Sequence, residues 1–247
     1  TPPTPSFDMS RLTAEKLAAE AGSPLFWRRQ TARRMLIERS HNPGWADLAS
    51  PILVQLARES TEPAAVINAL HTLDGLMKLD FDLIVEILKH ADAGVRRQAL
   101  TFVEQRMADA RYRKPCLPLA DDPEPIVRLQ LALTLVNNFD DQMQPALARL
   151  ARQEGEDPWM RTAILSSLGE GKNGQMLSEL LSQPADLGQA HGMLEPLCAA
   201  IGARRDKREI DVALVQIAAV GDAALQALCL RGIRSSFGSS VAVPLGD

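Results

Sequence analysis

The chain has 247 residues, of which 46% are hydrophobic and 4% aromatic, and its formal net charge is −4. This acidic balance argues against broad nucleic-acid binding, which requires a basic face. No apolar run approaches the roughly 20 residues needed to cross a bilayer, and no signal-peptide pattern is visible. Because the sequence starts with Thr-Pro-Pro-Thr-Pro rather than Met, we expect a fragment, or a mature form, of a longer protein.

Three segments are expected along the chain. Residues 1–9 are rich in proline and predict a linker. Residues 10–234 carry nearly continuous helical patterns and predict one elongated helical domain. Residues 235–247 are rich in Ser and Gly and predict a second linker or a frayed end.

The first two helices have recognisable start signals. Ser10 is the expected cap of a short helix, and Ser23-Pro24 is expected to open a longer one. Phe26 and Trp27 are predicted on the buried stripe of this second helix, with three further apolar residues. These three are Ala32, Met35 and Leu36.

Further helices follow, separated by loops that contain Pro, Gly or Asp. The segment near Cys116 is expected to be weak because Pro115 and Pro118 interrupt it. The predicted ranges are 46–59, 62–76, 81–90, 95–108, 116–120, 122–135, 141–153, 157–169, 173–182, 187–201, 208–220 and 222–233.

Two of these stretches, 122–135 and 157–169, are near-copies of one pattern. Each opens with Asp-Pro, reaches an Arg behind an apolar residue, and continues as a helix rich in Ala and Leu. Pro is tolerated at the first helical position, and Asp before it accepts hydrogen bonds from free N–H groups. The apolar position recurs roughly every 30–40 residues, which is the range of helical repeats. Its predicted occurrences are Trp27, Val66, Val95, Val127, Met160, Met193 and Leu225.

This repeat predicts an all-α, right-handed α-solenoid of about seven helical hairpins. A β-propeller has a repeat of similar length, but it needs strand-like alternation and more aromatic residues than this chain has. An acidic residue also precedes a basic one by four positions in three successive units, and we expect a structural ladder of these pairs along the stack. The pairs are Asp92 and Arg96, Glu124 and Arg128, and Asp157 and Arg161.

No catalytic, cofactor-binding or metal-ligating constellation is expected. None of the four histidines has a ligand neighbour at metal spacing, and His71 is predicted to be a packed histidine with Asp74 as a candidate partner. Ser166-Ser167 lacks a nucleophile elbow and is interpreted as a close helix contact. The glycine-rich turn after Leu168 lacks a preceding strand and is interpreted as a helix cap. The cysteines are Cys116, Cys198 and Cys229, and are expected to be small buried hydrophobes.

Clusters of basic residues are the remaining candidates for an interaction surface. The first is formed by Arg28, Arg29, Arg33 and Arg34. The second and third are formed by Arg111, Arg113 and Lys114, and by Arg204, Arg205, Lys207 and Arg208. If all three lined one concave face, that face would suit a phosphate backbone, but solvated faces and pairs between repeats are the expected arrangement.

The Asp-Pro-x-Val-Arg helix-pair pattern resembles HEAT-like repeats, close to the type named after phycobilisome lyases. Several stretches between residues 10 and 185 are also similar, in their order, to the HEAT-like region of large secreted planctomycete proteins. Those are described as membrane-bound dehydrogenase-like or haem-binding-domain proteins. The stretches are Trp27-Arg-Arg-Gln-Thr-Ala-Arg-Arg-Met-Leu-Ile-Glu-Arg39, Asn68-Ala-Leu-His-Thr-Leu-Asp-Gly-Leu76, Gly94-Val-Arg-Arg-Gln-Ala-Leu100, Val127-Arg-Leu-Gln-Leu-Ala-Leu-Thr-Leu135 and Asp157-Pro-Trp-Met-Arg161.

The resemblance implies a spacer between a dehydrogenase-like propeller and a c-type haem domain, in the periplasm or otherwise exported. No Cys-x-x-Cys-His occurs in this chain, so no haem residue is carried over. We therefore expect a scaffold without enzyme activity or cofactor, which holds a protein partner or neighbouring domains of the same chain. Two alternatives remain open: a nucleic-acid-binding HEAT-like module, as in some DNA-repair glycosylases, and a lyase-type subunit that handles a chromophore.

Overall fold

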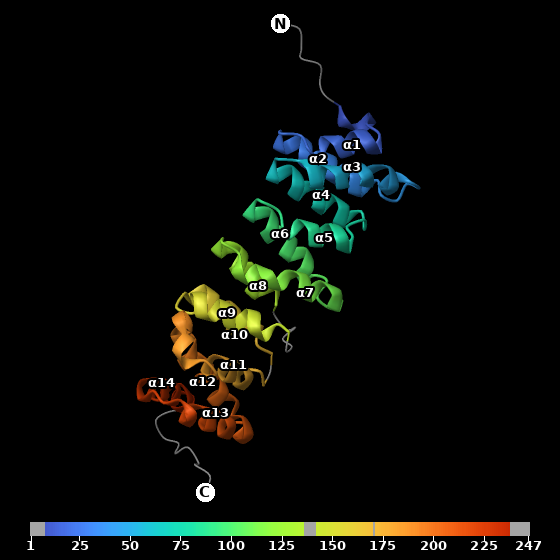
Figure 1. Ribbon diagram of the computed structural model, residues 1–247. Helices are drawn as coiled ribbons and strands as arrows, with labels where there is room; N and C mark the ends of the chain where they lie inside the picture. The colour runs from blue at the N-terminus through green and yellow to red at the C-terminus, as the bar shows by residue number, and fades with distance from the viewer. Residues whose placement is uncertain (1–7, 136–141, 170, 238–247) are drawn as a thin grey trace. The chain divides into compact units, whose positions relative to one another are not determined.

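The computed structural model describes residues 8–135, 142–169 and 171–237. All regular structure in these ranges is helical, which confirms the predicted all-α class (Figure 1). Residues 1–7 of the predicted linker 1–9 and residues 238–247 of the predicted tail 235–247 lie outside the described residues, whereas Met9 lies in a short helix and Ser235 ends the last helix. No helix in the described ranges combines the length and apolarity needed to span a membrane.

The observed helices follow the predicted order closely. Short 3-10 helices occur at Met9–Arg11 (η1), Ala110–Tyr112 (η2), Leu117–Asp121 (η3), Pro184–Asp186 (η4) and Gly188–Ala190 (η5). The α-helices are α1 Ala14–Glu20, α2 Phe26–Glu38, α3 Trp45–Glu59, α4 Pro63–Gly75, α5 Phe81–Ile87, α6 Ala93–Glu104, α7 Arg113–Cys116, α8 Pro125–Thr134, α9 Gln144–Glu154, α10 Pro158–Ser167, α11 Asn173–Leu181, α12 His191–Arg204, α13 Lys207–Ala219 and α14 Ala223–Ser235.

The chain forms two compact units, Thr1–Phe102 and Val103–Asp247. In unit 1, α1 packs on α2 and α3, and α4 packs on the same two helices. Successive helical pairs therefore stack on one another through buried Leu, Val and Ala side chains (Figure 1). This is how a helical repeat buries a core, because each pair supplies an apolar face to the next.

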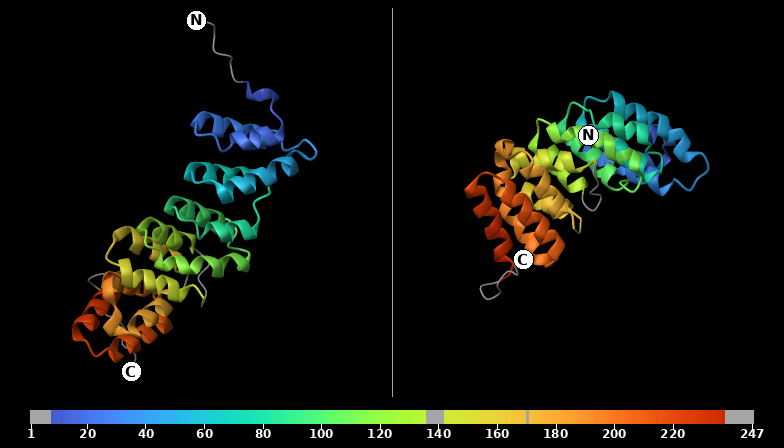
Figure 2. Two further views of the ribbon diagram at one scale, coloured as in Figure 1. Left: turned by 45° about the horizontal axis from the view of Figure 1, so that its top comes forward. Right: turned by 60° about the horizontal axis from the view of Figure 1, so that its bottom comes forward.

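Unit 2 contains two layers of helices. One layer consists of α8, α10, α12 and α14, each in contact with the next, and the other of α9, α11 and α13 (Figure 2). Alternate helices thus fall in alternate layers, as expected for stacked hairpins in an α-solenoid. The predicted close helix contact at Ser167 is confirmed, because its buried hydroxyl in α10 donates a hydrogen bond to the Ala132 carbonyl in α8.

Aspartates cap several helices, as the Asp-Pro pattern predicts. Asp157 Oδ1 accepts hydrogen bonds from the backbone N–H groups of Trp159 (2.9 Å) and Met160 (2.8 Å). In the preceding copy the cap is Glu124, with Pro125 at the first helical position, so α8 begins two residues later than the predicted Asp-Pro. The first short helix likewise begins at Ala14 with Thr13 as its cap, and the predicted cap Ser10 lies in η1.

The two caps give a matched test of local stability. Replacing Asp157 with Ala is expected to lower the free energy of unfolding by about 1 kcal/mol, because two N–H groups lose their acceptor. Glu124→Ala is the control, because the Glu124 side chain makes no capping hydrogen bond and should change stability by less than about 0.5 kcal/mol. Urea unfolding measures both values, and equal losses would contradict the assignment of the caps.

The repeated arginines share one position but do not form the predicted ladder of i,i+4 pairs. Arg96 Nη1 donates to the carbonyls of His90 and Ala91, both at 2.8 Å, in the loop before its helix. Arg128 likewise donates to the Asp122 carbonyl, and its guanidinium pairs with Glu154 of α9. In the described structure Glu124 is not the acid that Arg128 contacts, because the guanidinium turns back over the loop.

Arg161 behaves in the same way, with Nη1 at 3.5 Å from the carbonyls of Gly155 and Glu156. Its predicted partner Asp157 caps α10 instead. Each arginine therefore links the loop between two hairpins to the helix that follows this loop. Gln226 of α14 replaces the arginine and donates to the Val220 carbonyl at 2.7 Å.

In α2 this position is held by Arg29, which donates to the carbonyls of Ser23 and Pro24. The predicted repeat position is therefore one residue off in the first two units. The third residue after the observed cap is Arg28 in the first unit, not Trp27, and Ala65 in the second, not Val66. In the first unit the difference concerns the two aromatic residues that begin α2. Phe26 and Trp27, predicted to be buried, are 69% and 52% exposed.

Candidate functional site

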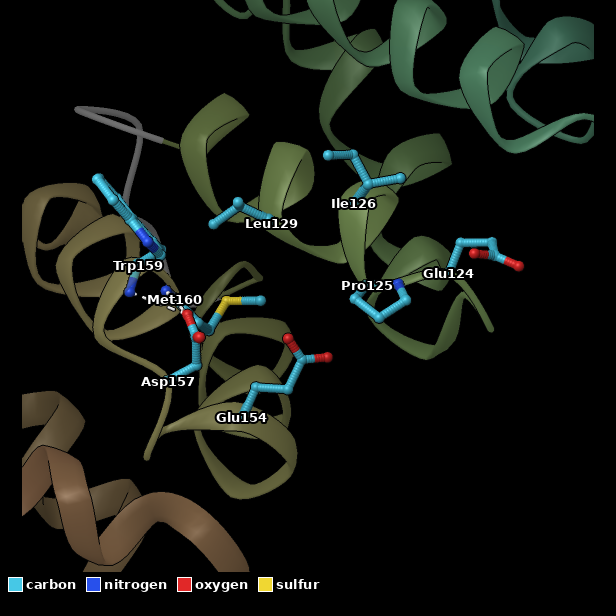
Figure 3. Close-up of a pocket in the computed structure, with 8 residues that line it drawn as sticks. All are labelled: Glu124, Pro125, Ile126, Leu129, Glu154, Asp157, Trp159 and Met160. Carbon is cyan, nitrogen blue, oxygen red and sulfur yellow. Dashed lines mark hydrogen bonds between the residues drawn. The ribbon is translucent and has the colours of Figure 1, made fainter.

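Unit 2 contains a groove of about 420 Å³ where α8 and α10 begin, beside the end of α9 (Figure 3). We call it the α8–α10 groove. It is lined by Glu124, Pro125, Ile126, Leu129, Glu154, Asp157, Trp159 and Met160. The two Pro-containing stretches that form it are visible in the sequence, but their pattern does not predict the groove.

The repeat places the apolar residues of this groove at equivalent positions. Ile126 and Trp159 are each the second residue of their helix, directly after the initial proline. Their side chains face away from the core, so Ile126 is 47% exposed and Trp159 is 76% exposed. Met160, by contrast, is buried and forms part of the floor. Large exposed apolar side chains that line one groove are typical of binding surfaces.

Acidic residues line the other side of the groove. The carboxylates of Glu154 and Asp157 lie opposite Leu129, and Glu124 lies at the end away from Trp159 (Figure 3). Glu154 is paired with Arg128, and one oxygen of Asp157 is used in capping α10. The Glu124 side chain has no bonded partner among the described residues. The groove is therefore apolar on one wall and net negative on the other.

This arrangement contains no recognisable catalytic machinery. In the described residues no three His, Cys, Asp or Glu side chains come together as a metal site. A nucleophile with an adjacent base is not found among the residues that line the groove. What the groove offers chemically is an apolar contact surface next to carboxylates, which suits binding of a peptide segment.

His71 is a packed histidine, as predicted. Its ring meets the edge of Phe102 with ring centroids 5.0 Å apart. Burial and the charge of Arg33 lower its pKa, although Asp74 and a hydrogen bond with Gln98 act in the opposite direction. Gln98 is thus the hydrogen-bonding side chain, and Asp74 contributes through its charge.

All three cysteines are buried, which confirms their interpretation as small hydrophobes. Burial raises the pKa of the Cys116 thiol to about 12. The sequence did not reveal that Cys198 of α12 and Cys229 of α14 meet. A hydrogen bond between these two thiols, together with burial, raises the pKa of Cys198. The two cysteines are separated in the sequence by about one repeat length, and this spacing could have indicated that they lie next to each other.

Cysteine labelling tests this burial. At pH 8 the native protein is expected to react with a disulfide reagent such as Ellman's reagent at least about tenfold more slowly than the urea-unfolded chain, because all three thiols are buried away from the reagent and the pKa values of Cys116 and Cys198 are raised. The reaction is followed by absorbance, with the unfolded chain giving the full count of three thiols. Rapid labelling of native protein at the unfolded rate would contradict the buried placement.

The predicted basic surface is largely engaged within its own unit. Arg28 pairs with Glu20 at 3.2 Å, and Arg29 is bonded to the loop before α2. Arg34 pairs with Glu38 of the same helix and stays mostly exposed. In unit 2, members of the other two clusters also pair with carboxylates, Arg111 with Asp109 and Arg204 with Glu209. A role for these clusters in binding stays a prediction.

Neither a protein-family model nor a curated protein matches this chain. Among solved structures, the chain is similar to the complex of CpcE and CpcF of phycocyanin lyase from Nostoc sp. PCC7120, with 16% identity over 96% of this chain and 99% of that chain and a TM-score of 0.42. A designed armadillo repeat protein has 15% identity over 90% and 99% and a TM-score of 0.32. An engineered protein has 18% identity over 90% and 98% and a TM-score of 0.33. At these TM-scores the likenesses carry no argument about function.

Proposed function

We propose that this chain is a non-catalytic docking scaffold, and that the α8–α10 groove binds a segment of another protein or of a neighbouring domain. The observation that carries the proposal is that Trp159 and Ile126 are both exposed and line one groove. A tryptophan exposed at the surface costs solubility and contributes little to the core, whereas tryptophans dominate binding energy at protein interfaces. The stacked hairpins supply a stiff frame for such a contact.

A retention experiment tests this proposal. The purified chain is immobilised and exposed to extract of its source organism in three forms: wild type, Trp159→Ala and Trp27→Ala. Trp27 is the matched control, because it is an exposed tryptophan at the start of a helix in unit 1. We expect a discrete protein that wild type and Trp27→Ala retain and Trp159→Ala loses. Equal retention by all three forms would count against the groove.

Stability must be measured in parallel. Trp159 is mostly exposed, so Trp159→Ala is expected to change the free energy of unfolding by less than about 0.5 kcal/mol. A loss of binding at unchanged stability then belongs to the surface and not to the fold.

We further propose that the scaffold links a dehydrogenase-like propeller to a c-type haem domain in a larger exported, periplasmic protein. The support is the resemblance of residues 10–185 to the HEAT-like region of such proteins. Intact mass and an absorption spectrum of the native protein test this. A mass far above 26.9 kDa with a haem Soret band is expected, and a mass near 26.9 kDa without haem would contradict it.

The two alternative functions receive less support. The carboxylates of the α8–α10 groove disfavour a nucleic-acid backbone, and arginines of the three basic clusters are paired within their own units. A chromophore-handling role would require an enclosed cleft of pigment size, whereas the groove is open to solvent. A titration with a bilin chromophore separates this role from docking, because a docking scaffold should give no change in the pigment spectrum.

A further inference from the structure

We propose that the α8–α10 groove selects a partner segment in which a lysine or arginine neighbours an apolar residue. This inference rests on the proposed docking function and names the chemistry of the partner. It follows from how apolar and charged groups are distributed around the groove.

The apolar wall provides the anchor. Trp159, Leu129 and Ile126 come from two helices and line one groove together with the buried Met160 (Figure 3). Because the second residues of both helices are exposed, one aliphatic or aromatic side chain of a partner can contact both helices at once. Exclusion of water from this contact favours an apolar residue at the anchor position.

The acidic wall provides the charge selection. Glu154 meets Arg128 through Oε1, and Asp157 caps α10 through Oδ1, so the second oxygen of each carboxylate is not used in these bonds. The third carboxylate is that of Glu124, whose side chain makes no hydrogen bond or ion pair with the described residues. The groove lining thus holds three carboxylates, of which only Glu154 is paired with a guanidinium, and this excess of negative charge is complementary to a cationic side chain.

The aromatic ring strengthens the same preference. Trp159 lines the groove and is 76% exposed, and in Figure 3 its ring extends away from the Asp157 carboxylate. A lysine or arginine that reaches this ring meets a π-face, which attracts a cation as the carboxylates of the groove lining do. An acidic segment would meet repulsion from the same carboxylates, so charge also rejects the wrong partner.

Selection from a random peptide library tests the proposal through the composition of the peptides that bind. Phage-displayed peptides are selected on the wild-type chain and depleted on Trp159→Ala, so that only groove-dependent sequences remain. We expect the survivors to be enriched in Lys or Arg next to Leu, Ile, Val or an aromatic residue. Their affinity should fall as salt concentration rises, because the charged contacts are exposed.

A charge variant provides the second arm. Glu124→Gln combined with Asp157→Asn removes two charges, while Asn at position 157 still caps α10. We expect the selected peptides to bind this variant at least about tenfold more weakly, with the free energy of unfolding checked by urea. Groove-dependent peptides without Lys or Arg, or affinity unchanged in the charge variant, would overturn the inference while leaving the docking function intact. No Trp159-dependent peptides at all would overturn both.

Discussion

Replacing Gly232 with alanine is expected to destabilise unit 2 by about 2 kcal/mol. Gly232 lies in α14 where this helix packs closely on α12. A Cβ atom there would lie 2.4 Å from the Glu195 carbonyl oxygen and 2.7 Å from Cys198 Cβ. Since the first of these atoms belongs to the backbone, α12 and α14 must move apart, and such overpacking costs about 1–3 kcal/mol or more. The gain in helix propensity, about 1 kcal/mol, offsets only part of this.

Gly221→Ala is the matched control for this substitution. A Cβ at Gly221, in the turn before α14, meets no atom within 4 Å. The same change of residue type should therefore leave the free energy of unfolding unchanged there, or raise it by about 0.4–1 kcal/mol, because alanine lowers the conformational entropy of the unfolded chain. The midpoint of urea unfolding measures both variants. If Gly232→Ala were as stable as Gly221→Ala, the close contact between α12 and α14 would be wrong.

Replacing Arg96 with methionine is expected to lower the free energy of unfolding by about 2–3 kcal/mol. Arg96 is only 8% exposed, and its guanidinium donates to the carbonyls of His90 and Ala91. Methionine preserves much of the length of the side chain but removes these charge-assisted hydrogen bonds. Each contributes about 1.5–3 kcal/mol, and part of this loss is offset when the freed carbonyls form hydrogen bonds with water. The loop between α5 and α6 then loses its attachment to α6.

The neighbouring Arg97 gives the control. Its side chain is less buried than that of Arg96, so Arg97→Met is expected to change stability by less than about 0.5 kcal/mol. Hydrogen exchange adds a local readout, because amides at the start of α6 should exchange faster in Arg96→Met than in Arg97→Met. Similar unfolding free energies for the two variants would show that the loop carbonyls do not need the guanidinium.

Local patterns were sufficient to predict the helices. The Asp-Pro start at Asp157 and the apolar periods of the chain indicated the all-α class and the order of the hairpins, because capping and helix periodicity depend on neighbours in sequence. The observed helix boundaries differ from the predicted ones by a few residues where two possible helix starts lie close together in the sequence. In α8, for example, Asp122-Pro123 and Glu124-Pro125 both have start chemistry, and the helix begins at the second.

Contacts made through the backbone could not be predicted in this way. The spacing between Asp157 and Arg161 suggested an ion pair, but one oxygen of this carboxylate accepts hydrogen bonds from the free N–H groups of α10. The guanidinium instead finds carbonyls that only the folded loop exposes. Amphipathic pattern alone also placed Trp27 inside, whereas the position of the α2 cap turns it to solvent.

The α8–α10 groove could not be predicted because it depends on two helices at once. Each sequence copy shows one apolar residue after Pro, and a single exposed apolar residue is ordinary on a protein surface. Only stacking of α8 beside α10 brings Ile126 and Trp159 to a common rim with the acidic end of α9. A repeat thus predicts which residues are equivalent, and the packing decides which of them become a surface.

Photo-crosslinking from the groove tests the docking function most directly. A photoreactive phenylalanine analogue is placed at Ile126 in the α8–α10 groove or, as the control, at Val215, an exposed apolar residue of α13. The proposed function predicts that irradiation in extract of the source organism yields one discrete adduct from position 126, which excess wild-type chain suppresses and excess Trp159→Ala does not. Equal labelling from both positions, or suppression by Trp159→Ala as well as by wild type, would contradict it.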